Sequence, residues 1–467
     1  MSNSLKKGIF YVFLANVINL IFNLITNFVL PKKLSIGSYA DIKTYQLYVS
    51  YAGLFHFGFV DGMYIKYGGK NINSIDKRDL KINLNTLRFF QIIISALFLF
   101  VSIITRDIVL IFFSVSIVPL NLGNYFKQLY QATGEFSLYG KIMNITTALI
   151  FIANMIWIFI FKVDNPFYFL ASNVVAYIIV WIILEIDCKK YIGNIKSIFP
   201  TFSFKELITN IKAGILLTIG NLSSILLTSM DRWFVKALLN TVAFAEYSFA
   251  VSMENFMNTA VTPVTITLYN YFCKTIDHKK IHNVRNYIMI FSTAIVACAF
   301  PAKFILEKYL HKYTNSIDVM FLLFAAQIFY IIIKSIYVNL YKANRQQRLY
   351  FVKLASVIFV GFLFNIICFK IVGVKESFAV GTLLSAIYWY ILCIVDFKWI
   401  KLNVKELLYP FFEMTIFLIC GFYLKAIIGF IIYIVCTIVV AKIFMTKEID
   451  IILKTAIRKI KLSYKKK

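Results

Sequence analysis

The sequence predicts an all-α integral membrane protein with fourteen transmembrane helices. Three observations predict it: a very apolar composition, apolar stretches of membrane-spanning length, and positive charges that concentrate on alternate loops. Of 467 residues, 60% are hydrophobic and only 15% are charged, whereas soluble domains average about 45–50% apolar. A water-soluble core cannot bury so large an excess, so the lipid bilayer is the expected environment.

The apolar stretches define the predicted helices. A helix needs ~20 mostly apolar residues to cross ~30 Å of hydrocarbon. The first stretch is too long for the apolar region of a signal peptide, so we expect it to be retained. The second and eighth exceed the usual length, which indicates tilt or projection from the bilayer. The predicted ranges are 8–30, 37–65, 84–105, 107–133, 138–161, 166–187, 206–239, 242–273, 285–306, 315–341, 350–372, 377–397, 405–424 and 427–445.

The distribution of lysine and arginine predicts the orientation. With the amino terminus inside, 35 of the 49 basic residues fall in inward-facing segments and about 12 in outward-facing ones. Cytoplasmic loops of membrane proteins carry such an excess of positive charge. A missed or added helix would invert every later loop, so the alternation supports both the number of helices and a cytoplasmic location of both termini.

The net charge of +27 does not indicate nucleic-acid binding. The basic residues cluster at the expected membrane edges, where anionic lipid headgroups attract them. The seven cysteines include no closely spaced pair, and we expect no partner acid for His278 and His282, which lie four residues apart in a basic loop. We therefore expect no disulfide framework, no metal site and no nucleic-acid partner.

An internal repeat relates the two halves of the chain. Residues 129–139 and 340–350 share the pattern L-Y-x-A-x5-L-Y at an offset of 211, and Asn154 falls on Asn365 at the same offset. Both segments follow the fourth predicted helix of their half and lie on the same side of the membrane. The repeats are therefore predicted to be parallel, an arrangement that recurs in secondary transporters.

This repeat predicts the domain organisation. A polar segment separates six helices from eight, and we expect it to be a cytoplasmic linker. The basic tail has apolar residues at helical spacing, which favours an amphipathic helix on the inner leaflet, with a disordered tail as the alternative. The predicted domains are an N-lobe at 1–187, the linker at 188–205, a C-lobe at 206–397, two further helices at 398–445 and the tail at 446–467.

Several short motifs carry a resemblance to a known family. The resemblance rests on Gly214 through Arg232, Ala245-Glu246-Tyr247-Ser248, Pro31, Gly37, Tyr39-Ala40, Phe57-Gly58-Phe59 and Gln131-Ala132-Thr133-Gly134. In their order and spacing the chain resembles the MOP exporter superfamily, and within it the O-antigen type of polysaccharide flippase. Ala40 departs from the pattern, because this branch often has glycine there, and the departure limits any finer placement.

The resemblance implies two six-helix lobes plus two carboxyl-terminal helices, a MOP/MATE-like fold. It implies a transporter, not an enzyme, that flips undecaprenyl-pyrophosphate-linked oligosaccharides across the bacterial cytoplasmic membrane by alternating access. The implied partners are that lipid-linked substrate, membrane lipids, a polysaccharide polymerase and glycosyltransferases, and we expect a monomer. No cofactor is expected, and coupling to protons or sodium ions is left open.

Three basic residues within apolar stretches are the candidate substrate-binding residues: Lys43, Arg232 and Lys334. A charge at the bilayer centre costs at least ~2.5–3.5 kcal/mol, so such residues usually face a cavity and have partners. A lipid pyrophosphate needs cationic groups along its path. For Lys43 and Arg232 the alternative is a position at the outer interface, where long side chains reach the headgroups.

Four acidic residues are candidates for ion coupling or structural pairing: Asp61, Asp231, Glu246 and Glu254. Carboxylates at these positions can take up a proton or sodium ion, or pair with a basic residue such as Arg232. We favour Glu254 because it lies deeper in its helix than Glu246. Glu413 lies outside the twelve-helix core, and we expect a structural role for it.

Three other functions remain as alternatives. A MATE-like ion-coupled antiporter shares the fold but typically lacks the two extra helices. A flippase for the peptidoglycan lipid precursor would be expected to carry several arginines in its first helices, and the first two here have none. A membrane polysaccharide polymerase or ligase would need a large outer loop. The sequence contains no phosphate-binding P-loop, so ATP hydrolysis is not expected.

Overall fold

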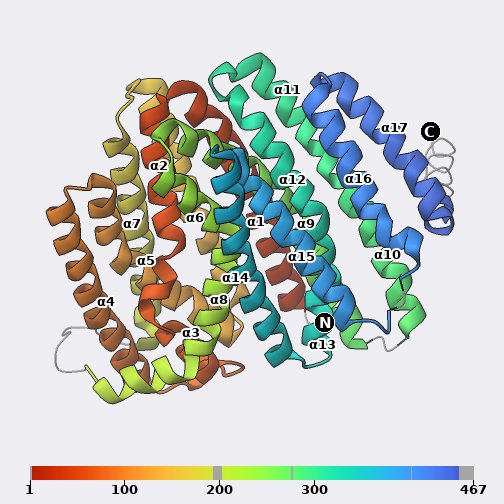
Figure 1. Ribbon diagram of the computed structural model, residues 1–467. Coiled ribbons are helices and arrows are strands. Elements are labelled where there is room, and N and C mark those ends of the chain that lie inside the picture. Colours follow the sequence, from red (N-terminus) through yellow and green to blue (C-terminus); the bar gives the residue numbers. More distant parts are fainter. Residues whose placement is uncertain (1–2, 193–201, 275–276, 401, 452–467) are drawn as a thin grey trace, which may run out of the picture. The chain divides into compact units, whose positions relative to one another are not determined.

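The architecture is taken from a computed structural model that describes residues 3–192, 202–274, 277–400 and 402–451 (Figure 1). The described part of the chain consists of helices joined by short connections and contains no β-strand. Residues 193–201 of the predicted linker and 452–467 of the predicted amphipathic tail lie outside the described residues. The contacts divide the chain into two compact units, Met1–Ser229 and Met230–Lys467.

The N-terminal unit is built from seven α-helices and most of an eighth. In this unit α1 packs on α6, α4 on α5, and α5 on α7. Short turns of 3-10 or π geometry (η) interrupt some helices. The elements are α1 (Asn3–Lys33), α2 (Ile36–Ser50), η1 (Ala52–His56), α3 (Phe59–Tyr67), η2 (Ile72–Ser74), α4 (Lys77–Thr105), α5 (Ile108–Thr133), α6 (Phe136–Met155), η3 (Ile156–Ile160), α7 (Pro166–Ile192) and α8 (Phe204–Leu238), whose last residues belong to the other unit.

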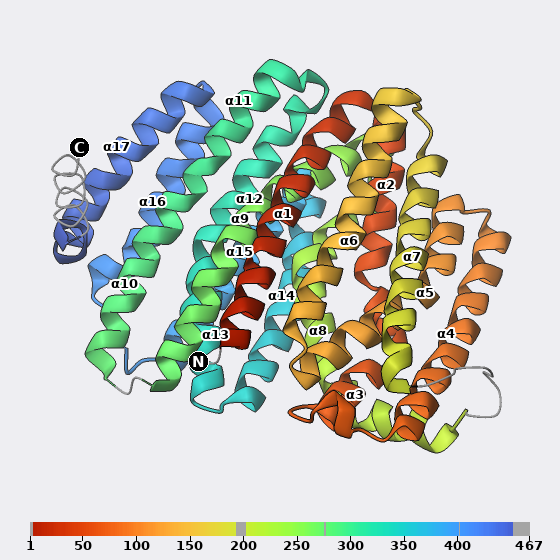
Figure 2. The same ribbon diagram turned by 180° about the vertical axis from the view of Figure 1, so that it is seen from behind.

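The C-terminal unit contains the remaining helices. In both views α16 and α17 lie side by side, with α10 and α11 beside them (Figures 1 and 2). The elements are α9 (Thr241–Lys274), α10 (His278–Ile295), η5 (Val296–Cys298), α11 (Ala299–Tyr309), η6 (His311–Ser316), α12 (Ile317–Ile332), η7 (Ile333–Tyr337), α13 (Val338–Ala343), α14 (Gln347–Val372), α15 (Glu376–Asp396), α16 (Val404–Tyr423) and α17 (Ala426–Phe444).

The predicted fold class is confirmed at the level of a helical membrane protein. Within the described residues, ten helical segments are long and apolar enough to cross a membrane, so the chain is a multi-pass membrane protein. Each of the fourteen predicted ranges also coincides with helical structure. The number of fourteen crossings stays a prediction, because the segments around α1, α2, α6 and α9 are not among those ten.

The predicted helix 37–65 is wrong as a single helix. It is broken between α2 and α3, where Phe57 and Gly58 adopt left-handed backbone angles (φ 51° and 92°). Only glycine adopts such angles without steric cost. Hydrophobicity cannot reveal this break, because the residues on both sides of it remain apolar.

The break allows α3 to contact α8 backbone to backbone. A Cβ atom at Gly62 would lie 2.0 Å from the carbonyl oxygen of Asn210, and one at Gly214 would lie 2.0 Å from that of Gly58. Real side chains never approach so closely. Small residues permit such close helix crossings in membrane proteins, and here they hold α8 against α3 within the N-terminal unit, which includes α8 as far as Ser229.

The predicted lobes and the observed units differ in the placement of α8. The sequence repeat assigns this helix to the second half, whereas the contacts of residues 204–229 group them with the first. The repeat is a similarity between two segments of the sequence, whereas a compact unit is defined by the contacts between residues in one conformation of the protein. The lobe boundaries therefore remain a prediction beside the observed division.

The two repeat segments have the same local geometry. Tyr130, at the end of α5, donates to Asp187 on α7 over 2.7 Å, and Tyr341, in α13, donates to Asp396 on α15 over 2.5 Å. In each segment the backbone N–H five residues after the tyrosine donates to the tyrosine carbonyl at 2.8 Å, immediately after a residue of positive φ, Gly134 or Arg345. These equivalent contacts support the repeat.

The glycine contact between α3 and α8 gives a stability prediction. Replacing Gly214 by alanine should lower the melting temperature of the purified protein, because overpacking costs roughly 1–3 kcal/mol. Gly220 is the matched control on the same helix, since no atom lies within 4 Å of its Cβ position. Gly220→Ala should be neutral or stabilising, and equal melting temperatures for both variants would contradict the close crossing.

Candidate functional site

Four of the predicted site residues gather in the C-terminal unit. Asp231 and Arg232 lie near the end of α8, Glu254 lies in α9 and Lys334 lies in η7. Asp231, Arg232 and Lys334 are all close enough to Glu254 to interact with it electrostatically. We call these four residues the charged cluster. Two cations and two carboxylates make it formally neutral.

Asp231 is held by neutral hydrogen-bond donors. It is buried, and its carboxylate accepts hydrogen bonds from the Tyr247 hydroxyl at 2.7 Å and from Thr382 at 3.5 Å. The backbone N–H of Arg232 adds a third bond at 2.7 Å. These contacts connect α8, α9 and α15, so Asp231 braces the unit as well as contributing charge to the cluster.

Glu254 also has a neutral partner. It is half-buried, and its Oε1 accepts a hydrogen bond from the side-chain amide of Gln327 on α12. Gln327 is itself buried among apolar residues of α12. A glutamine in such surroundings needs polar partners, and Glu254 provides one.

Lys334 sits in a π-helical turn. The five residues Ile333–Tyr337 interrupt the helix that runs from α12 into α13. Such turns insert one extra residue and are frequent at functional sites. The Lys334 ammonium lies 5.4 Å from the ring centre of Tyr330, one turn earlier, and interacts electrostatically with Glu254.

Arg232 completes the cluster. It is half-buried and interacts electrostatically with both Asp231 and Glu254. Arginine offers a planar fork of N–H donors that fits phosphate, while lysine acts as a compact point charge. Because neutral groups already hydrogen-bond both carboxylates, an anionic ligand can approach the cations without leaving either carboxylate unpartnered.

Glu246 does not belong to this cluster. It is buried and forms an ion pair with Lys375, which immediately precedes α15, and it accepts a hydrogen bond from Asn315 at 3.2 Å. Although Glu246 and Glu254 are eight residues apart on one helix, their partners differ. The sequence left ion coupling and structural pairing open for Glu246, and the structure places it in an ion pair.

Lys43 is buried in α2 of the N-terminal unit. Its ammonium donates to Asn27 at 2.9 Å and to Gln46 at 3.1 Å, and lies 5.3 Å from the ring centre of Tyr39. These contacts join α1 and α2. Two amide oxygens and an aromatic ring thus surround the Lys43 ammonium within the N-terminal unit.

Asp61 lies in the first turn of α3, at the crossing with α8. The hydroxyl of Thr218 on α8 donates to its carboxylate over 2.5 Å. Asp61 is buried beside the glycine contact described above. Its position supports a structural role in that crossing.

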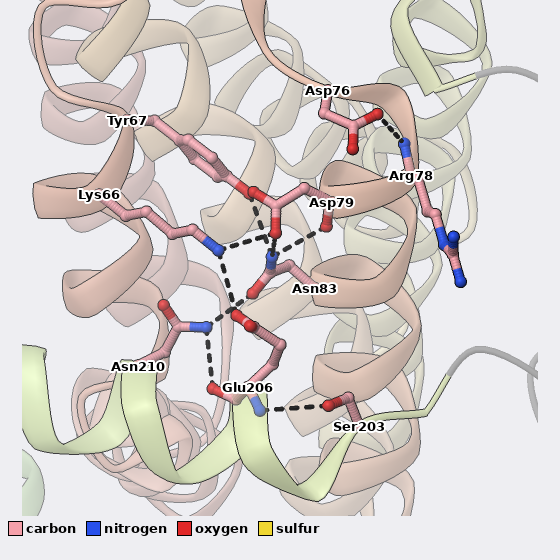
Figure 3. Close-up of polar contacts among 9 residues, drawn as sticks. All are labelled: Lys66, Tyr67, Asp76, Arg78, Asp79, Asn83, Ser203, Glu206 and Asn210. Carbon is pink, nitrogen blue, oxygen red and sulfur yellow. Dashed lines mark hydrogen bonds and ion pairs between the residues drawn. The ribbon is translucent and has the colours of Figure 1, made fainter.

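A polar network joins α3, α4 and α8 at the end that the charge distribution predicts to be cytoplasmic (Figure 3). Lys66 donates to Asp79 at 2.7 Å and to Glu206 at 3.1 Å. Asn83 receives a hydrogen bond from Asn210 at 2.6 Å and donates to Asp79 at 3.0 Å. This network and the glycine contact fix the same part of α8.

Several partner residues in these sites were not predicted from the sequence. Gln327 and Lys375 could have been found, because each is a polar residue in or beside a long apolar stretch. Thr382 and Asn83 carry no such signal, since small polar residues are common in membrane helices. Their roles follow only from the packing that brings distant helices together.

The comparisons with known proteins identify the fold. The solved structure of the lipid II flippase MurJ in an inward closed conformation matches with a TM-score of 0.61 at 12% identity, covering 94% of this chain and 99% of that one. A mutant of the Vibrio cholerae MATE transporter VcmN matches with a TM-score of 0.45 at 13% identity, covering 85% and 96%. The likeness to MurJ shows that this chain has the same fold.

A MATE family transporter of the MOP superfamily in an inward-facing conformation also matches, with a TM-score of 0.45 at 12% identity over 83% of this chain and 95% of that one. No model of a known protein family matches the sequence, and no curated protein matches it. The comparisons therefore establish the fold, and function must be argued from the residues.

The polar network predicts a stability effect. Burial lowers the pKa of Lys66, but the hydrogen bonds to Asp79 and Glu206 more than offset this, so its pKa lies above the ordinary value. Lys66→Gln should lower the melting temperature at neutral pH by the equivalent of about 1 kcal/mol. The exposed Lys77, at the start of α4, provides the control, and Lys77→Gln should have no effect.

The pH dependence of this effect has a definite sign. Because the pKa of Lys66 is higher in the folded than in the unfolded protein, its contribution to stability is complete at pH values below the unfolded-state pKa. The contribution is lost as the pH rises through the folded-state pKa. The difference between wild type and Lys66→Gln should therefore be constant at neutral pH and shrink in strongly alkaline solution. A difference that grows with pH would contradict the network.

Proposed function

We propose that this protein flips undecaprenyl-pyrophosphate-linked oligosaccharides across the bacterial cytoplasmic membrane for surface polysaccharide synthesis. Arg232 and Lys334 bind the pyrophosphate from the C-terminal unit, and Lys43 serves the same purpose in the N-terminal unit. The lipid tail stays in the bilayer while the charged head crosses. Transport needs no covalent chemistry, so no enzymatic step is proposed.

The charged cluster is the observation that carries this proposal. Cations at hydrocarbon depth are costly and are retained where they serve a ligand or a partner. Here each carboxylate of the cluster has its own neutral donor, Tyr247 and Thr382 for Asp231 and Gln327 for Glu254. Both carboxylates of the cluster thus have neutral donors beside Arg232 and Lys334, whose cationic groups suit the oxygens of a pyrophosphate.

The fold is compatible with this proposal. One solved structure with the same fold is that of a lipid II flippase, a protein whose named substrate is also a lipid. At 12% identity this likeness does not extend to the substrate, so the choice of an oligosaccharide-linked lipid rests on the sequence resemblance and on the charged cluster.

Replacing Lys334 tests the proposed substrate site. In a deletion strain complemented with Lys334→Gln, surface polysaccharide should fall at least tenfold, because a hydrogen bond to a charged group contributes about 1.5–3 kcal/mol. Lipid-linked repeat units should accumulate on the inner leaflet, measured by lipid extraction and accessibility to an impermeant glycosidase.

The matched control is Lys370→Gln, because Lys370 is exposed on α14. This variant should restore wild-type polysaccharide at the same expression level. Full activity of Lys334→Gln would overturn the assignment of this residue. Accumulation of unpolymerised units on the outer leaflet of the deletion strain would instead indicate a polymerase.

The carboxylates of the cluster favour a second candidate, a MATE-like antiporter for organic cations. Glu254 would then bind the cation, and Glu254→Gln would abolish export while Lys334→Gln would retain it. Under the flippase proposal, cells producing the wild-type protein should accumulate ethidium as fast as cells without it. Ethidium export with the opposite dependence on these two residues would establish the antiporter.

A further inference from the structure

Glu413 is a buried acid in the carboxyl-terminal helix pair, remote in sequence from the charged cluster. It lies in the middle of α16, and its exposed fraction is 0%. Figures 1 and 2 both show α16 beside α17, and α16 also packs on α10 and α12. These helices enclose its carboxyl group within a membrane-spanning part of the unit.

The carboxyl group has a single hydrogen-bond partner in the described part of the chain. The Thr437 hydroxyl on α17 lies 2.9 Å from Oε2, while the buried Oε1 has no partner there. Glu413 thus differs from Glu406, two turns earlier on the same helix. Glu406 pairs with Arg285 at 2.9 Å and with His282 at 3.1 Å.

The groups that face Glu413 are uncharged at neutral pH. Thr293 on α10 hydrogen-bonds the hydroxyls of both Tyr409 and Tyr433, and each tyrosine interacts electrostatically with Glu413. From α12, Phe321 and Phe329 pack on phenylalanines of α16. Tyr409 on α16 and Tyr433 on α17 are the titratable groups that interact with Glu413, and Cys420 interacts with Tyr433 and Cys436. On α16 the nearest ion pair is that of Glu406, and the Lys303 ammonium of α11 donates to the carbonyl of Gly421, two turns after Glu413.

An ionised carboxylate is unfavourable in these surroundings. An unpaired buried charge costs many kcal/mol, and such groups neutralise instead. A protonated carboxyl removes that cost. The Thr437 hydroxyl, which donates to Oε2 in this structure, can serve the acid form as donor or as acceptor. The contacts therefore fit the acid form, and the charged form would need water or a cation to enter between the helices.

We propose that Glu413 is a proton-binding site that controls the packing of the carboxyl-terminal helix pair. With the proton bound, α16 and α17 pack against α10. Loss of the proton places a charge among apolar and hydroxyl groups and opens the pair to water. This inference does not rest on the proposed flippase function, because none of its contacts involve the charged cluster.

Infrared spectroscopy of the purified wild-type protein tests the protonation state. The spectrum at neutral pH should contain the C=O band of a protonated carboxylic acid, with the usual shift in heavy water. Glu413→Gln should remove this band, and Thr437→Val should shift it because the hydrogen bond is lost. Glu254→Gln is the control for an acid of the charged cluster, and the band assigned to Glu413 should persist in it.

Thiol labelling tests the effect on packing. Cys420 is buried on α16, two turns after Glu413, and its alkylation can be followed by peptide mass spectrometry. Labelling of Cys420 should rise with pH more steeply in wild type than in Glu413→Gln, which carries the same thiol but no titratable group at 413. Equal pH dependence in both proteins would overturn the proposed control of packing.

A sodium ion is the competing occupant. Sodium binding would show carboxylate bands in place of the acid band and a melting temperature that rises with sodium chloride but not with potassium chloride. Either result, or the absence of any band sensitive to Glu413→Gln, would overturn the proton site. A failed flippase assay would leave these spectra unchanged, so the two proposals fail independently.

Discussion

The absence of water in the hydrocarbon core is the constraint on which this structure depends. Every backbone polar group must be paired inside the protein, and a helix achieves this within a single segment. The same constraint governs the side chains, because charges that water would solvate must find partners on neighbouring helices. The cluster around Glu254 and the network around Lys66 are two solutions, one made within membrane-spanning helices and one at a helix end.

Helix positions were predictable because hydrophobicity is a local property of the chain. The breaks within helices were not, since each depends on distant residues. The interruption near Phe57 and Gly58 accompanies contact with Gly214, more than 150 residues away in the sequence. The π turn at Ile333–Tyr337 contains Lys334, but a charge in an apolar run does not indicate a change of helix type. The assignment of α8 likewise reflects contacts that the repeat pattern cannot specify.

The charged residues of the candidate site could be predicted from the sequence, but their hydrogen-bond and ion-pair partners could not. A charge in an apolar stretch stands out, and Asp231, Arg232, Glu254 and Lys334 do gather in one unit. Their neutral partners came from Tyr247, Gln327 and Thr382, residue types too common in membrane helices to single out. Glu246 shows the limit of spacing arguments. Eight residues are close to two full helical turns, so the spacing places Glu246 and Glu254 on roughly one face, but Glu246 pairs with Lys375.

The acidic residues differ in the kind of partner that they have, and the partner determines how well a negative charge is stabilised. Glu246 and Glu406 are fixed by cations, so their charge is satisfied within the structure. Asp231 and Glu254 accept hydrogen bonds from neutral donors, and Glu254 also interacts electrostatically with Arg232 and Lys334. Glu413 has only the Thr437 hydroxyl, so its charge itself is what can change. In a medium without water, an acid paired with a cation has a structural role, whereas an acid with only a neutral partner can gain or lose a proton.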